Sequence, residues 1–93
     1  MKMYVKKPIP VPALQWTGDN FQEIKDFCTD ENLEEMCFTN NKDLWVKTRE
    51  GQLMAQVGDF IMKGIEGEFY PCAESVFKKT YDEVIEPKLV ANY

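Results

Sequence analysis

Residues 58–72, GDFIMKGIEGEFYPC, place a nucleophile, a cation and three acids close together in the chain. Cys72 follows Pro71 and precedes a stretch with helical character, and the dipole at the N-terminus of a helix can lower the pKa of a thiol. With Lys63 or Glu68 as base and electrostatic partner, Cys72 would be the nucleophile of a small thiol enzyme. The structural alternative is a small buried residue, because free cysteine is among the most buried residue types.

The glycines of this stretch match no phosphate-binding motif. Gly58, Gly64 and Gly67 form neither G-x-G-x-x-G nor a P-loop. Gly64 and Gly67 are instead expected to supply positive φ in a hairpin connection of about four residues. Lys63 and Glu68 would then flank the turn and face each other across the ladder as an exposed pair.

The chain contains no histidine, so the common Ser-His and Cys-His pairs cannot form within it. Its three cysteines, Cys28, Cys37 and Cys72, lie at unrelated spacings and offer no C-x-x-C pair. We therefore expect no metal site and no cofactor. An odd number of cysteines also favours reduced thiols in a cytoplasm over a disulfide framework.

Aromatic residues supply a second kind of candidate site. Trp16 and Tyr70 could stack on a flat ligand while Lys63 binds a phosphate, which would suit a scavenger of a nucleotide-like signal. Core packing is the alternative, because a small protein needs most of its aromatic residues inside. The candidate binding residues are Trp16, Asp59, Lys63, Glu68, Tyr70 and Cys72.

Composition limits the partners. Sixteen acids against eleven bases give a formal charge of −5, which disfavours direct nucleic-acid binding through phosphates. No apolar run is long enough to span a membrane, and no apolar segment follows the basic residues at the start. These features predict a cytoplasmic protein, and 93 residues predict one domain, 1–93.

The N-terminal half predicts an arm, a strand and a helix. Three alternating prolines in residues 1–12 indicate an extended arm that pairs poorly. Residues 13–17, ALQWT, alternate as in a half-buried strand. Apolar positions from Phe21 to Cys28 follow helical spacing, with Asp19 or Asn20 as a cap.

The second half predicts mainly strands. Residues 36–48 are expected to form a hairpin, followed by strands at LMAQV, FIMK and EFYP. One or two helical turns over 73–79 and a closing strand at 81–85 would follow, with 87–93 as a peripheral tail. The predicted fold is α+β: a short helix on a strongly bent, mostly antiparallel sheet of five or six strands, with curling into a small barrel as an open alternative.

Two blocks and a third short run resemble a known group of proteins. ALQWTGDN fits A-x-Q-W-x-G-D-N, GDFIMKGIEGEFYPC fits G-D-[FWY]-I-x-K-G-x-x-G-E-F-Y-P-C, and FKKTY fits F-x-K-T-Y. With these blocks the chain resembles small proteins encoded by bacteriophages and prophages, over residues 12–82. The resemblance implies a phage product acting in a bacterial host cytoplasm, and by analogy an inhibitor of a host defence component.

Without a catalytic constellation, the preferred hypothesis is a non-enzymatic binding module. Its expected partner is a protein or a small ligand, and exposed strand edges predict a homo-oligomer. The thiol enzyme at Cys72 and the nucleotide-signal scavenger remain alternatives.

Overall fold

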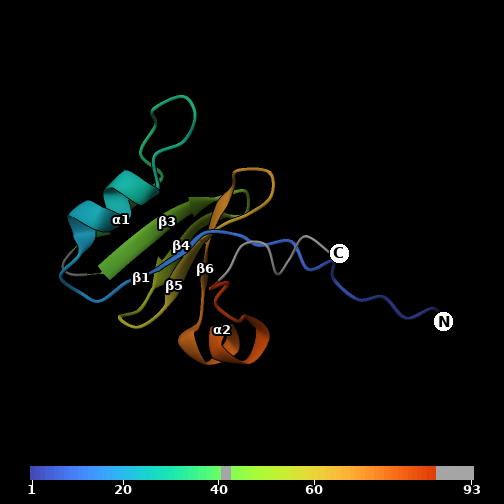
Figure 1. The fold of residues 1–93 in the computed structure, drawn as a ribbon. Coiled ribbons are helices and arrows are strands. Elements are labelled where there is room, and N and C mark those ends of the chain that lie inside the picture. The colour runs from blue at the N-terminus through green and yellow to red at the C-terminus, as the bar shows by residue number, and fades with distance from the viewer. Residues whose placement is uncertain (41–42, 86–93) are drawn as a thin grey trace.

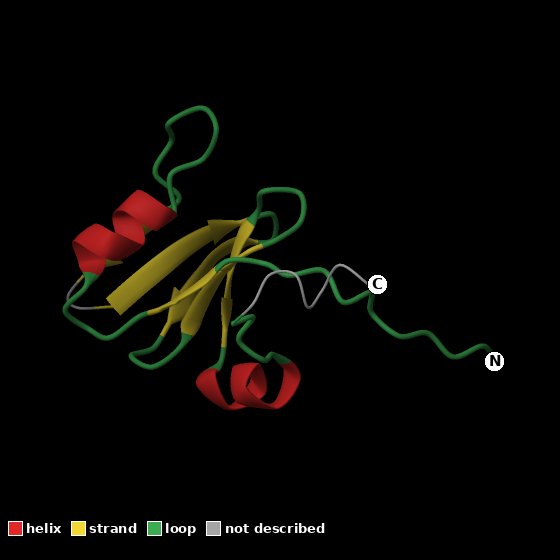
Figure 2. Ribbon diagram, viewed as in Figure 1, coloured by secondary structure: helices red, strands yellow, loops and turns green. Residues whose placement is uncertain are grey.

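The part of the chain that the structure describes forms six strands in two sheets and two helices (Figure 1 and Figure 2). The structure is a computed structural model, and it describes residues 1–40 and 43–85. The elements are β1 (Ala13–Gln15), α1 (Phe21–Phe27), β2 (Cys37–Asn40), β3 (Asp43–Thr48), β4 (Gly51–Ala55), β5 (Phe60–Lys63), β6 (Phe69–Cys72) and α2 (Glu74–Thr80).

The strands form two three-stranded antiparallel sheets, β1-β5-β6 and β2-β3-β4. The α+β prediction is confirmed, but the prediction of one bent sheet is wrong, and the described residues form no closed barrel. The break falls between β4 and β5. There the Trp16 N–H donates to the Asp59 carbonyl at 2.8 Å and the Gly58 N–H donates to the Trp16 carbonyl at 2.7 Å. These bonds align β5 with β1 rather than with β4.

The core lies between the two sheets and α1. Ile61 of β5 and Phe69 of β6 enter it from one sheet, and Leu44 and Val46 of β3 enter it from the other. Ile24 of α1 closes it and is fully buried. Because side chains alternate along a strand, the β1-β5-β6 sheet keeps a second face, which α2 covers in part.

Helix α1 forms where the apolar spacing predicted it. Ile24 is buried, and Phe21 and Phe27 pack against the core. Asn20 occupies the N-cap position, yet its side chain makes no capping bond to the helix. Instead its amide accepts from the Thr17 N–H and donates to the Gln15 carbonyl, both at 2.9 Å. The expected cap therefore ties the helix start to β1.

Two predicted hairpins are confirmed, β2–β3 within residues 36–48 and β5–β6 after it. In the β5–β6 turn only Gly67 has positive φ, at 82°, so the expectation for Gly64 is wrong. A side chain at Gly64 would instead collide with the carboxylate of Glu68. The ladder pairs Lys63 with Phe69. The prediction that Lys63 and Glu68 face each other across the ladder is therefore wrong.

The predicted helical turns over 73–79 appear as α2, whereas residues 81–85 join no strand. Phe77 faces inward as expected and stacks on Phe60 of β5, with ring centroids 3.7 Å apart and planes 9° apart. Val76, also expected inward, is half exposed. Apolar packing on Phe60 therefore holds this end of the chain without a closing strand.

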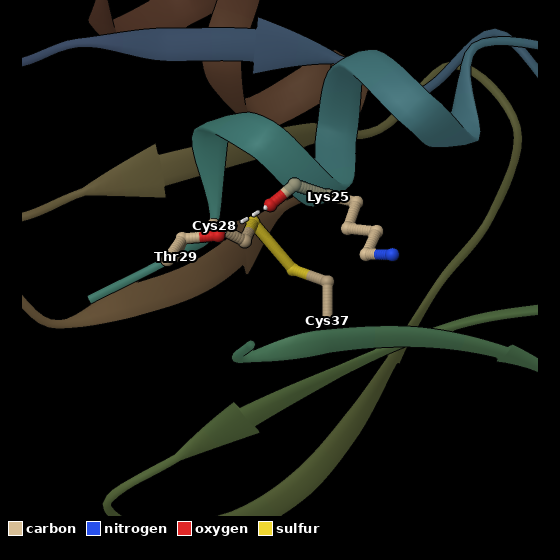
Figure 3. The surroundings of a disulfide bond; sticks show 4 residues. All are labelled: Lys25, Cys28, Thr29 and Cys37. Atoms are coloured by element: carbon tan, nitrogen blue, oxygen red, sulfur yellow. Dashed lines mark hydrogen bonds between the residues drawn. A yellow bond between two sulfur atoms is a disulfide. The ribbon is translucent and has the colours of Figure 1, made fainter. Parts of the chain in front are cut away.

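The end of α1 is joined to β2 by a disulfide between Cys28 and Cys37 (Figure 3). The reduced thiols expected for these two cysteines are absent, and only Cys72 is free. Packing of α1 on the core sets the two Cα atoms 5.9 Å apart, within the range that a disulfide spans. Beside the bond, the Thr29 hydroxyl donates to the Lys25 carbonyl at 3.0 Å.

Residues 1–12 form the predicted arm: they contain no helix or strand, and they run away from both sheets (Figure 1). The Pro12 carbonyl accepts from the Lys63 N–H at 3.0 Å, which anchors the arm to β5. The predicted tail, 87–93, lies outside the described residues. Among the residues that the structure describes, no helix is long and apolar enough to cross a membrane.

Candidate functional site

The six candidate residues do not form one site. Trp16 lies in the core, Asp59, Tyr70 and Cys72 lie near α2, and Lys63 and Glu68 lie at the end of the sheets where the loops meet. The two sequence blocks meet in space through the β1–β5 ladder and through the backbone bonds of Trp16 to the turn before β5.

Trp16 is a core residue. Its side chain is 2 % exposed and belongs to the main hydrophobic cluster, so its ring faces are covered by other residues. Its Nε1 is buried with no acceptor among the described residues. Packing explains the choice of a large aromatic here, and a flat ligand could not stack on this ring without opening the core.

Asp59 organises the turn between the two sheets. Its Oδ2 accepts from the Gln56 N–H at 2.9 Å, and its Oδ1 accepts from the Glu74 N–H at 3.3 Å. A carboxylate at the start of α2 is also favoured by the helix dipole. The Gln15 amide reinforces this corner by donating to the Gly58 carbonyl at 2.9 Å and to Glu74 at 3.0 Å. Asp59 thus has a structural role.

Tyr70 and Cys72 share the face of β6 that looks toward α2. Burial, together with the neighbouring Tyr81 phenol, raises the pKa of Tyr70 to about 12. Burial, and then the charge of Asp59, raises the pKa of the Cys72 thiol above its ordinary value. The predicted lowering by the dipole of α2 is therefore wrong, because desolvation and a nearby anion both oppose the thiolate.

Lys63 and Glu68 line an open depression of about 380 Å³ at one end of the molecule. Three connections line it: the α1–β2 loop, the β3–β4 turn and the β5–β6 turn, the last two of which lie side by side in Figure 1. Phe69, 2 % exposed, lies at the bottom. The remaining lining residues are Asp30, Glu31, Met36, Lys47, Thr48, Arg49, Glu66 and Gly67.

Three cations reach this depression, and they differ in their partners. Arg49 Nη2 lies 2.8 Å from Glu66 Oε2, an ion pair that links the β3–β4 turn to the β5–β6 turn. Lys47 and Lys63 take part in no ion pair within the described residues. The Lys63 ammonium lies over the Phe69 ring, 5.8 Å from its centroid. Two unpaired ammonium groups on a partly apolar surface suit an anionic group.

Glu68 is already engaged by its own turn. Its Oε1 accepts from the Glu66 N–H at 3.1 Å, and its carboxylate lies against Gly64. It therefore stabilises the β5–β6 connection on the rim of the depression. Only Lys63 among the six candidates combines a place in the depression with a side chain that has no ionic partner in the described part of the chain.

Lys47 was missed by reasoning from the sequence. It lies near the end of LWVKT, where a lysine is an ordinary polar residue of a half-buried strand. Its distance in sequence from Lys63 gives no sign that the two approach one depression. They do so because β3 and β5 belong to different sheets that pack around a shared core.

The lining of the depression offers charged and hydrogen-bonding side chains. The described residues contain no group of three or more histidine, cysteine or acidic side chains able to hold a metal ion. In comparisons with known proteins, no family model, curated protein or solved structure matches this chain.

Proposed function

We propose that this protein is a non-enzymatic binding module whose depression accepts an anionic group of a partner protein or small ligand. The observation that carries the proposal is the pairing of Lys47 with Lys63, from different sheets, in one solvent-reached depression. Neither lysine has an ionic partner among residues 1–40 and 43–85. The bacteriophage or prophage origin and the host cytoplasm belong to the proposal through the sequence resemblance alone.

The surroundings favour one compact anion over an extended polyanion. Asp30, Glu31, Glu66 and Glu68 also line the depression, and the whole chain carries −5. A long phosphate backbone would meet these carboxylates and be repelled. A single carboxylate or phosphate bound by the two ammonium groups would gain charge-assisted hydrogen bonds and, being small, would meet fewer of these carboxylates.

Arg49 has a different role in this proposal. Its ion pair with Glu66 is exposed and contributes little stability by itself. It does join the β3–β4 turn, which follows Lys47, to the β5–β6 turn, which follows Lys63. The binding site for an anion would therefore be preorganised.

Neither alternative function is favoured by a specific observation. A thiol enzyme needs an accessible thiolate, and both burial and Asp59 raise the pKa of Cys72. A nucleotide scavenger was expected to stack its base on Trp16, which is buried in the core. Lys63 keeps the phosphate-binding role that this alternative gave it, now with Lys47 instead of an aromatic residue as its partner.

The test is an NMR titration of the full chain with pyrophosphate, AMP and a short acidic peptide as probes. We expect shifts confined to the three connections around the depression. Replacing Lys47 or Lys63 with glutamine should weaken binding about tenfold, since a hydrogen bond to a charged group is worth about 1.5–3 kcal/mol. Lys79→Gln is the matched control, because Lys79 is exposed on α2.

Two results would contradict the proposal. One is a complete lack of shifts with all three probes at millimolar concentration. The other is binding that Lys79→Gln weakens as much as the two substitutions in the depression do, which would indicate nonspecific attraction to lysines in general.

A further inference from the structure

The N-terminal arm has the pattern of a strand without a sheet. Met1, Met3 and Val5 alternate with Lys2, Tyr4 and Lys6, as apolar and polar residues alternate in a half-buried strand. Met1, Met3, Tyr4 and Val5 are between 86 % and 114 % exposed. The backbone of residues 1–6 makes no hydrogen bond to any described residue. Residues 1–6 thus expose apolar side chains together with backbone N–H and C=O groups that bond to no described residue.

The prolines hold this segment away from its own domain. Pro8, Pro10 and Pro12 restrict φ and favour an extended, stiff connection. The arm is anchored at Pro12 and touches the domain again at Lys6, whose Nζ lies 3.4 Å from the Tyr81 hydroxyl. Residues 1–5 lie beyond that contact, and Figure 1 shows them leading away from the sheets.

The same molecule carries an open sheet edge of matching length. Strand β4, Gly51–Ala55, is hydrogen-bonded to β3 alone in the part of the chain that is described. Leu53 and Met54, which point to opposite faces, are 39 % and 44 % exposed. An edge of this kind, with apolar side chains and free backbone groups, is a template for another strand.

The other edges are less suitable. Strand β1 has three residues and continues directly into the arm. The end of α1 lies beside the start of β2, joined to Cys37 by the disulfide and to the residues just before the strand by the bridge between Thr29 and Glu35. Strand β6 contains Pro71, which has no N–H to donate. Strand β4 is therefore the edge that can accept a new strand along its whole length.

Charge indicates that the acceptor is a second copy of this chain. Residues 1–12 contain three of the eleven bases and none of the sixteen acids. The remaining residues carry eight bases and sixteen acids, a formal charge of −8, and exposed Glu50 directly precedes β4. A basic strand and an acidic domain attract each other. In a two-fold symmetric dimer, the contact between the arm of one copy and β4 of the other forms twice.

We infer that two copies exchange arms, each adding residues 1–6 as a fourth strand along β4 of the other. This goes beyond the proposed function, because it involves neither Lys47 nor Lys63. Exchange would cover the exposed apolar residues of the arm and the open edge of β4 in one step.

The test measures mass and contacts of the full chain in solution. Light scattering with size-exclusion chromatography should give twice the mass of one chain. Met3→Asp with Val5→Asp should weaken the dimer by more than about tenfold, as loss of central interface contacts does. Ile65→Asp is the matched control, because Ile65 is an exposed apolar residue, 70 % exposed, in the β5–β6 turn.

Isotope-filtered NOEs in a sample that mixes labelled and unlabelled chains should then connect residues 1–6 of one copy to β4 of another. Three results would overturn the inference: a monomer at NMR concentrations, a dimer unaffected by the two arm substitutions, or arm–β4 NOEs found only within one chain. Circular dichroism of the double variant should be unchanged, since the arm packs on no core residue, and this separates loss of the dimer from loss of folding.

Discussion

Reduction of the disulfide between Cys28 and Cys37 should destabilise the fold without changing it. Both residues are buried, at 0 % and 2 % exposure, so after reduction their sulfur atoms still fill the same space. What is lost is the crosslink, which spans a sequence separation of 9. The chain-entropy relation for a closed loop of about ten residues gives about 2.7 kcal/mol at 25 °C.

This loss is large for a small domain. In a chain of 60–100 residues each kcal/mol corresponds to about 4–8 °C in melting temperature, so reduction should lower it by about 10–20 °C. The assay is thermal unfolding followed by circular dichroism, with and without a phosphine reductant. Cys72→Ser is the background of choice, because it leaves Cys28 and Cys37 as the only cysteines.

The control replaces Cys28 and Cys37 together with alanine in the same background, and its melting temperature should not respond to the reductant. The reasoning is refuted if the oxidised and reduced forms, verified by mass, melt at the same temperature. The disulfide itself is refuted if the protein purified without reductant and then denatured contains two free thiols.

Three further measurements test individual residues. Tyr70 should ionise near pH 12 in an absorbance titration, and the substitution Tyr70→Phe should remove this step. Because the pKa of Tyr70 is raised in the folded state, its contribution to stability is complete below pH 10 and is lost as the pH rises toward 12. Cys72 should alkylate more slowly in the native protein than in urea, and faster native reaction would contradict its raised pKa. Gly67→Ala should cost about 1 kcal/mol in a melt, because φ is +82° and no atom lies within 4 Å of the added Cβ; an unchanged melt would contradict this.

Local patterns in the sequence predicted most of the elements. The spacing of Phe21, Ile24 and Phe27 predicted α1, because a helical stripe needs only neighbours in sequence. The turn residues between strands predicted the β2–β3 and β5–β6 hairpins for a similar reason. The strand expected at residues 81–85 is absent, and Tyr81 instead stacks on Phe77, which itself stacks on Phe60 across the fold.

The candidate site depended much more on tertiary contacts. Side-chain type marked Trp16 and Cys72 as candidates, but packing buries Trp16 in the core and, through partial burial, raises the pKa of the Cys72 thiol. Asp59 gained its role from the Gln56 and Glu74 N–H groups, the second of which is distant in sequence.

The sequence by itself determined the α+β class, the helix α1, the hairpins and the arm, because these follow from periodicity, proline and turn chemistry within short windows. Only the tertiary structure decided that the strands divide into two sheets, that Cys28 meets Cys37 and that Lys47 joins Lys63. Those pairings depend on how separate elements pack around one core. The fifteen-residue stretch that first suggested chemistry is thus mainly a hairpin and a corner, and Lys63 is the residue in it on which the proposed binding role depends.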